Sequence, residues 1–359
     1  MARPDRSEDI ERALLREVDA HPRDLVRVVA DSMRLSRTAV AARARVLVEA
    51  GFLEKEGTTR PTYRRGPNRR AEFRHALADL QEDRVWSRDV APLLRGLSAN
   101  VLDICHHAVT EMVNNTIDHS EGSEVRIEVV VKEGRVELSV VDDGIGIFRK
   151  ITRALALPDE RLALLELSKG KLTTDPKRQS GEGVFFTSRM FDHFEIESGG
   201  LVFDHDATEP DDILLDIDET ADVGGTAVRM AIAADSPRTA RQIFDAFSSG
   251  PDEYAFAKTV VPVRLAKVGD ENLISRSQAK RLLLRVDRFR CVMLDFEGVT
   301  TIGQAFADEI FRVFSNEHPE VELVAIHAVP EVQQMIRRAE VLRDEQGGQL
   351  PLLKSKEPT

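Results

Sequence analysis

Two short stretches near the middle of the chain carry the residues whose types and spacing could do chemistry. In the first, residues 110–119, Glu111, Asn115 and His119 follow one another at intervals of four. If this stretch is helical, the spacing stacks a carboxylate, an amide and an imidazole along one side. Polar groups at such positions cost stability when they are buried alone, so this row indicates a binding site rather than a core stripe.

The second stretch is Val-Asp-Asp-Gly-Ile-Gly at residues 141–146. It follows an alternation of apolar residues that predicts an antiparallel hairpin over residues 124–140. The second strand therefore ends in Asp142 and Asp143. Gly144 and Gly146 come next, and a glycine lets a backbone approach a ligand because it has no Cβ.

Two further glycine turns follow. Gly181 and Gly183 precede an amphipathic pattern, which predicts a helix whose first amide groups would face an anion. Later, Gly224-Gly225-Thr226 introduces a β-like run over residues 227–231. These turns predict a binding site between a helical layer and a mixed sheet, with glycines at its opening.

Length and composition limit the class of protein. A chain of 359 residues exceeds what one core usually organises, which favours two or three domains. The two cysteines, Cys105 and Cys291, lie far apart in apolar runs, which argues against a disulfide framework and for a reducing compartment. No hydrophobic signal segment and no run of membrane-spanning length is found, so we expect a cytoplasmic protein without membrane association.

The formal net charge of -12 is unevenly distributed. Residues 1–75 contain 17 Lys and Arg against 12 Asp and Glu, so the acidic excess lies in the rest of the chain. Binding to nucleic acid requires local positive charge. Any contact with DNA is therefore expected in the N-terminal segment.

The N-terminal segment has the pattern of a small helical domain. Apolar residues at helical spacing predict three helices within residues 8–50, and residues 52–65 predict a two-stranded hairpin with a basic tip. This order resembles the winged helix-turn-helix domains of bacterial regulators, in which the third helix enters the major groove. The resemblance makes four residues candidates for DNA binding: Arg37, Thr38, Arg45 and Arg60. A protein-interaction or dimerisation module of the same shape is the alternative.

Residues 66–70, Gly-Pro-Asn-Arg-Arg, combine residues that interrupt helices and strands with two positive charges, and they mark the first domain boundary. After it, a helical pattern is expected to resume through Phe73, Leu77 and Leu80, and a longer helix to span residues 98–119. The four polar and glycine motifs then follow in an order and spacing similar to the GHKL ATP-binding superfamily, which includes gyrase, Hsp90, histidine kinases, MutL and the anti-sigma-factor serine kinases. The resemblance implies a Bergerat-type α/β sandwich that binds ATP with Mg²⁺.

It also implies roles for individual residues. The Asp142 carboxylate would accept from the adenine amino group, and the Asn115 amide oxygen suits Mg²⁺. Glu111 matches the glutamate that activates water in the hydrolysing members. Lys171 or Lys169 could neutralise the phosphates. The remaining implied nucleotide-binding residues are Gly144, Gly146, Gly181, Gly183 and Thr226.

The C-terminal region alternates β-like and helical segments after residue 236. Residues 291–302 resemble the strand and loop of the STAS-like domains of anti-sigma-factor antagonists (a DUF4325-type domain). In that family the loop ends in a phosphorylatable serine, but Gly303-Gln304-Ala305 stands here instead, and Thr300 and Thr301 are the nearby hydroxyls. The resemblance therefore implies a domain that docks a protein partner.

Together these patterns predict an α+β multidomain protein with a winged helix-turn-helix domain at residues 1–66, a GHKL ATP-binding domain at 67–236 and a small STAS-like α/β domain with a polar tail at 237–359. The predicted function is an ATP-gated, DNA-binding regulator of the transcription type with slow ATPase activity. A homodimer is one of the oligomeric states that stay open. One alternative is a serine/threonine protein kinase of the anti-sigma-factor type. Another is a scaffold that holds ATP as a structural ligand.

Overall fold

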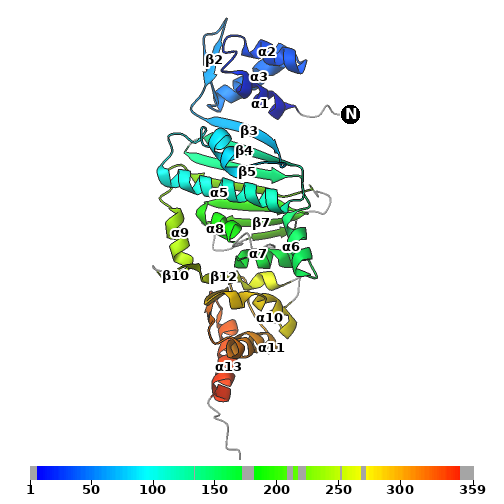
Figure 1. Ribbon diagram of the computed structural model, residues 1–359, viewed down its shortest axis with the longest axis vertical. Helices are drawn as coiled ribbons and strands as arrows, with labels where there is room; N and C mark the ends of the chain where they lie inside the picture. Colours follow the sequence, from blue (N-terminus) through cyan, green and yellow to red (C-terminus); the bar gives the residue numbers. More distant parts are fainter. Residues whose placement is uncertain are drawn as a thin grey trace, which may run out of the picture. The chain divides into compact units, whose positions relative to one another are not determined.

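A computed structural model describes residues 6–132, 134–171, 182–207, 213–216, 224–250, 253–267 and 272–347. The chain divides into two compact units. The first contains Met1–Ile147, Thr187–Thr208 and Leu214–Ala240, and the second contains Phe148–Phe186, Glu209–Ile213 and Arg241–Thr359. The elements are labelled along the chain in Figure 1.

The first unit begins with three helices and a hairpin, as the apolar spacing predicts. They are α1 (Ser7–Glu17), α2 (Leu25–Met33), α3 (Arg37–Glu49), β1 (Leu53–Glu56) and β2 (Thr62–Arg65). Ser36 caps α3, because its hydroxyl accepts a hydrogen bond from the Ala39 N–H at 3.2 Å. Leu14, Leu25 and Val40, one from each helix, are fully buried in a shared core.

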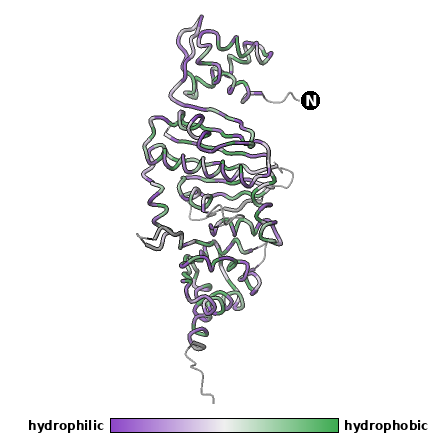
Figure 2. The backbone as a smooth tube through the Cα atoms, viewed as in Figure 1, coloured by the Kyte–Doolittle hydropathy of each residue, from purple (hydrophilic) through white to green (hydrophobic). Residues whose placement is uncertain are grey.

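The rest of the first unit is organised around a seven-stranded sheet in the order β3-β4-β5-β9-β6-β7-β8. Its strands are β3 (Arg69–Ala76), β4 (Glu124–Lys132), β5 (Arg135–Asp142), β6 (His193–Ser198), β7 (Leu201–Asp206), β8 (Ile213–Asp216) and β9 (Ala227–Ala233). Apolar and polar residues alternate along β5, and hydrophobic residues recur along the strands in Figure 2.

Helices lie beside this sheet. Following β3 come α4 (Glu82–Val85), the π-helical turn η1 (Trp86–Val90) and the long helix α5 (Ala99–His119), which runs along the sheet in Figure 1. Val101, Ile104 and Ala108 are fully buried on the apolar side of α5. The helix expected at residues 98–119 is thus present.

The expected helix through Phe73 was wrong, because residues 69–76 form strand β3. Every residue of β3 pairs with β4, from Arg69 opposite Val131 to Ala76 opposite Glu124. This pairing with a strand some fifty residues later overrides the local helical pattern.

The second unit contains a three-stranded parallel sheet in the order β12-β13-β14. Its strands are β12 (Lys258–Pro262), β13 (Cys291–Asp295) and β14 (Glu322–Ile326). Its other elements, together with the helices that cross into the first unit, are α6 (Ile147–Leu155), α7 (Arg161–Lys169), α8 (Gly183–Met190), α9 (Ala240–Phe247), β10 (Ser248–Gly250), β11 (Glu253–Phe256), η3 (Val263–Ala266), α10 (Arg276–Leu283), η4 (Val286–Arg288), α11 (Gln304–Asp308), η5 (Glu309–Phe314), α12 (Ser315–Glu317) and α13 (Pro330–Gly347). The C-terminal α/β alternation is confirmed.

Candidate functional site

Asp142 is the last residue of β5 and is 8% exposed. Its Oδ1 accepts hydrogen bonds from the Gly144 N–H at 2.9 Å and the Thr226 N–H at 3.3 Å. Burial raises the pKa of this carboxyl, although both backbone hydrogen bonds act in the opposite direction. Within the described part of the chain, Oδ2 accepts no hydrogen bond, so this oxygen can accept one from a ligand.

Thr226 holds this arrangement together. Its carbonyl accepts from the Asp142 N–H at 3.0 Å, and its hydroxyl accepts from the N–H of Ile147 at 3.0 Å. Ile147 is the first residue of α6, whose first N–H groups have no partner within the helix. One threonine therefore orients the Asp142 carboxylate and caps the following helix.

The glycines around Asp142 are required by the protein's own backbone. A Cβ on Gly144 would lie 2.1 Å from the Ser120 carbonyl oxygen, and one on Gly225 would lie 2.0 Å from the Asp142 carbonyl oxygen. Gly146 has a φ of +90°, and its Cβ would lie 2.5 Å from the Ser198 hydroxyl. The sequence predicts that Gly144 and Gly146 allow a ligand to approach. Their packing contacts are sufficient to explain them, and a role in ligand binding stays a prediction.

Helix α5 meets the loop after β5 at its C-terminal end, where the Ile145 N–H donates to the Ser120 carbonyl at 2.8 Å. On α5, Glu111, Asn115 and His119 are half-buried at the predicted spacing of four. The Asn115 side chain makes no hydrogen bond within the described residues. Its amide oxygen is therefore uncommitted and can act as a ligand.

Asp143 has a different role from its neighbour. Its carboxylate accepts from the Ser123 hydroxyl at 2.5 Å and from the N–H groups of Ser123 and Glu124 at 2.7 and 2.9 Å. The Ser123 hydroxyl is the main cause that lowers the pKa of Asp143 to about 2. Asp143 thus fixes the turn that leads into β4, whereas Asp142 keeps one oxygen without a partner among the described residues.

The predicted phosphate-binding residues lie in the second unit. Gly183 is the first residue of α8, whereas Gly181 lies outside the described residues. The Lys171 ammonium donates to the Arg288 carbonyl at 3.0 Å and lies 4.8 Å from the centre of the Phe289 ring. Burial lowers the pKa of Lys171. Its assignment to phosphate binding stays a prediction.

Lys169 is placed differently from what the sequence suggested, because it is 1% exposed at the end of α7. Its ammonium forms an ion pair with Glu166 at 2.5 Å and donates to the Leu284 carbonyl at 2.8 Å. Burial lowers the pKa of Lys169 to about 8, against the opposing effect of Glu166. Arg285 also contacts Glu166, at 3.3 Å. These contacts make Lys169 a structural residue that joins α7 to α10.

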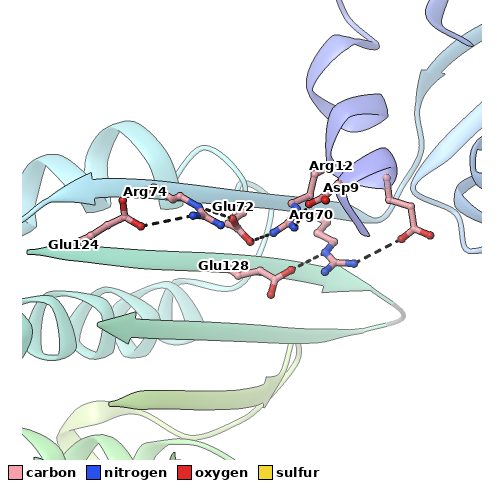
Figure 3. A network of polar contacts seen from close by, with 8 residues as sticks. Asp9, Arg12, Arg70, Glu72, Arg74, Glu124 and Glu128 are labelled. Atoms are coloured by element: carbon pink, nitrogen blue, oxygen red, sulfur yellow. Dashed lines mark hydrogen bonds and ion pairs between the residues drawn. The ribbon is translucent and has the colours of Figure 1, made fainter. Parts of the chain in front are cut away.

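A network of ion pairs that the sequence does not predict joins α1 to strands β3 and β4 of the sheet (Figure 3). Arg12 of α1 pairs with Glu72 of β3. Arg70 of β3 pairs with Glu128 of β4 at 2.6 Å and reaches Glu11 of α1 at 4.0 Å. The partners lie about sixty residues apart in sequence, so no local pattern indicates them.

The four candidate DNA-binding residues, Arg37, Thr38, Arg45 and Arg60, are all exposed. None of the three arginines forms an ion pair with any described residue. By contrast, Arg43 of α3 is paired with Glu11 at 3.2 Å and Arg65 of β2 with Asp19 at 2.8 Å. The charge of Arg37, Arg45 and Arg60 is thus not neutralised by the described residues.

In the described part of the chain, no helix is both long enough and apolar enough to cross a bilayer.

Comparison with family models gives two matches. Residues 73–203 match the histidine kinase-like ATPase domain, and residues 278–333 match the STAS-like domain of unknown function DUF4325. No curated protein matches the chain significantly. The first match includes α5, β5 and Asp142 but ends before Thr226, and the second includes β13 and β14. The chain therefore contains a histidine kinase-like ATPase domain, which implies that it binds ATP, followed by a C-terminal STAS-like domain.

Proposed function

We propose that this protein is an ATP-gated regulator, and that Asp142 recognises the adenine base. The observation that carries the proposal is the Asp142 carboxylate, whose Oδ1 is fixed by two backbone N–H groups while Oδ2 has no partner among the described residues. An oriented, buried acceptor suits the exocyclic amino group of adenine. Guanine carries a carbonyl oxygen at the equivalent position, which would face this acceptor unfavourably.

The phosphates and Mg²⁺ are assigned to the residues that the family resemblance indicates. Asn115 would ligate Mg²⁺ through its uncommitted amide oxygen, a hard donor of the kind that this cation prefers. Backbone amides at Gly181 and Gly183, with Lys171, would contact the phosphates. When bound, Mg²⁺ neutralises charge that develops on the phosphates. Glu111 lies one turn before Asn115 on α5 and would orient or deprotonate an attacking water.

Turnover of ATP separates this proposal from its alternatives. Incubating the full chain with γ-labelled ATP is expected to release labelled phosphate slowly, and Glu111→Gln is expected to reduce release by about 100-fold or more while leaving ATP binding intact. Label on Thr300, Thr301 or a partner protein would instead favour the kinase. Binding of ATP with neither product, in both the native chain and the variant, would favour the scaffold.

The N-terminal three helices and hairpin are proposed to form a winged helix-turn-helix domain that binds DNA. The proposal is supported by the exposed, unpaired arginines Arg37, Arg45 and Arg60 on α3 and the hairpin tip. Thr38, one residue into α3, could reach a base edge.

Filter binding to duplex DNA across a series of salt concentrations tests whether the N-terminal domain binds DNA. Affinity is expected to fall steeply with salt, and each alanine replacement of a phosphate-contacting arginine should reduce the slope of log K against log salt by about one. Arg43→Ala is the control, because Arg43 is already paired with Glu11. An absence of salt-dependent binding to any duplex would exclude the DNA assignment.

The domain limits are proposed as residues 1–66, 67–236 and 237–359, with the STAS-like domain docking a protein partner. A cytoplasmic location and a homodimer are proposed with them. ATP binding would then change the access of the winged helix-turn-helix domain to DNA, or of the STAS-like domain to its partner, as in other nucleotide-dependent switches.

A further inference from the structure

Two neighbouring strands of the parallel sheet in the STAS-like domain end in residues that can bind metal. Asp295 is the last residue of β13 and pairs in register with Ile326, the last residue of β14. His327 follows directly. Because the strands are parallel, both carboxyl ends meet at one edge of the sheet, where ligand-binding residues commonly gather.

The turn after β13 brings a third side chain to this edge. The Glu297 N–H donates to Asp295 Oδ1 at 3.0 Å, and the Val299 N–H donates to the Phe296 carbonyl at 2.9 Å. This tight turn directs Glu297 toward the histidine. His327 Nδ1 lies 2.9 Å from Asp295 Oδ1 and 3.6 Å from Glu297 Oε2.

The three donors are close enough to share one ion. One ligand atom from each of Asp295, Glu297 and His327 lies within 4.8 Å of the other two. Zinc–nitrogen and zinc–oxygen bonds are about 2.0–2.2 Å long, so two donors on a tetrahedral ion stand roughly 3.3–3.5 Å apart. The separations from His327 Nδ1 lie on either side of this value. Small side-chain rotations would therefore suffice to form the bonds.

Charge and exposure also suit a cation. Neither carboxylate forms an ion pair with a lysine or arginine in the described part of the chain, so two negative charges face a single imidazole. The Asp295 side chain is 10% exposed, whereas those of Glu297 and His327 are 34% and 55% exposed. The site is thus anchored on a buried carboxylate and open to water on its other side.

We propose that Asp295, Glu297 and His327 bind one divalent transition-metal ion in the STAS-like domain. A mixed set of one imidazole and two carboxylates suits Zn²⁺ or Mn²⁺, whereas Mg²⁺ and Ca²⁺ prefer oxygen donors alone. Solvent, or a carboxylate from a protein partner, would complete the coordination. None of these three residues belongs to the proposed ATP site or to the N-terminal helices and hairpin.

Isothermal titration of the metal-free full chain with Zn²⁺ and with Mn²⁺, in buffer containing excess Mg²⁺, tests the proposal. The native chain is expected to bind one equivalent of at least one ion. Binding should weaken by about 100-fold in His327→Asn, because this variant lacks one of the three donors. Circular dichroism shows whether the variant is folded. If it is not, Glu297→Gln removes a donor from the partly exposed turn instead.

His318→Asn is the matched control, because His318 forms a comparable exposed contact with Glu320 at 3.3 Å in the same domain. Its metal binding should equal that of the native chain. Equal binding by native protein, His327→Asn and Glu297→Gln would place the ion elsewhere and overturn the proposal. Absence of a bound equivalent of either ion in the native chain would overturn it as well.

Discussion

Asp142→Asn is expected to weaken ATP binding by about 100-fold while leaving the fold intact. An asparagine oxygen can still accept from the Gly144 and Thr226 N–H groups, which fixes the new NH₂ group where Oδ2 now lies. Two donors, this NH₂ and the adenine amino group, would then face each other. Loss of a hydrogen bond to a charged group costs about 1.5–3 kcal/mol, and tenfold in affinity corresponds to about 1.4 kcal/mol. Titration with a fluorescent ATP analogue measures the change.

Stability distinguishes loss of recognition from loss of structure. Because the folded-state pKa of Asp142 is raised by burial, its contribution to stability is present at low pH and is lost as the pH rises through that pKa. The neutral amide of Asp142→Asn carries no charge to bury, so this variant should not lower the thermal unfolding temperature. Native-like ATP affinity in a folded Asp142→Asn protein would contradict the assignment of adenine to Asp142.

Asp143→Asn is the matched control, because it alters the adjacent carboxylate that holds the turn before β4. It should bind ATP as the native chain does. Its folded-state pKa of about 2 lies below the ordinary value, so the stabilisation from Asp143 is present above about pH 4 and is lost as the pH falls toward 2. The variant should therefore lose the part of the acid sensitivity of unfolding that lies in this range.

Glu166→Gln is expected to destabilise the second unit by about 3–5 kcal/mol. Glu166 and Lys169 are each 1% exposed, and removal of one partner from a buried ion pair leaves an uncompensated charge. In this variant both Lys169 and Arg285 lose their carboxylate. Urea unfolding followed by circular dichroism measures the difference in the free energy of unfolding.

Lys169→Met is expected to cost less, because Glu166 keeps Arg285 as its counter-charge. Asp245→Asn is the control for removal of a carboxylate in general. Asp245 pairs with Arg241 at the surface of α9, where both side chains are largely exposed, so its loss should change stability by about 0.5 kcal/mol or less. A cost below about 1 kcal/mol for Glu166→Gln would show that the buried pair contributes little.

The local part of the fold could be predicted from the sequence. The alternation at residues 124–140 and the spacing on α5 are short-range signals, and both correspond to observed elements. Strand β3 could not be predicted in this way, because it forms by pairing with β4 across α4, η1 and α5. These helices separate β3 in sequence from the β4–β5 hairpin to which it adds a third strand.

In the candidate site, too, local features could be predicted from the sequence and those set by long-range contacts could not. Adjacent acids at the end of a strand indicate a site, but the different roles of Asp142 and Asp143 depend on contacts with Thr226 and Ser123. Lys169 looked like a phosphate ligand because its neighbours in sequence are polar and basic. Its position is set by Leu284 and Arg285, more than a hundred residues later. Tertiary contacts of this kind leave no local signature.

The position of β3 has a practical consequence for work with fragments. β3 is an end strand of the seven-stranded sheet and pairs with β4 on one side only, while α1 contacts it through the Arg12–Glu72 ion pair. A fragment that begins at residue 67 would lose this cover and present an eight-residue strand with a free row of backbone donors and acceptors. Such edges promote aggregation by strand pairing between molecules. The N-terminal helices thus limit strand pairing between molecules at β3, and fragments of the ATPase domain should retain them.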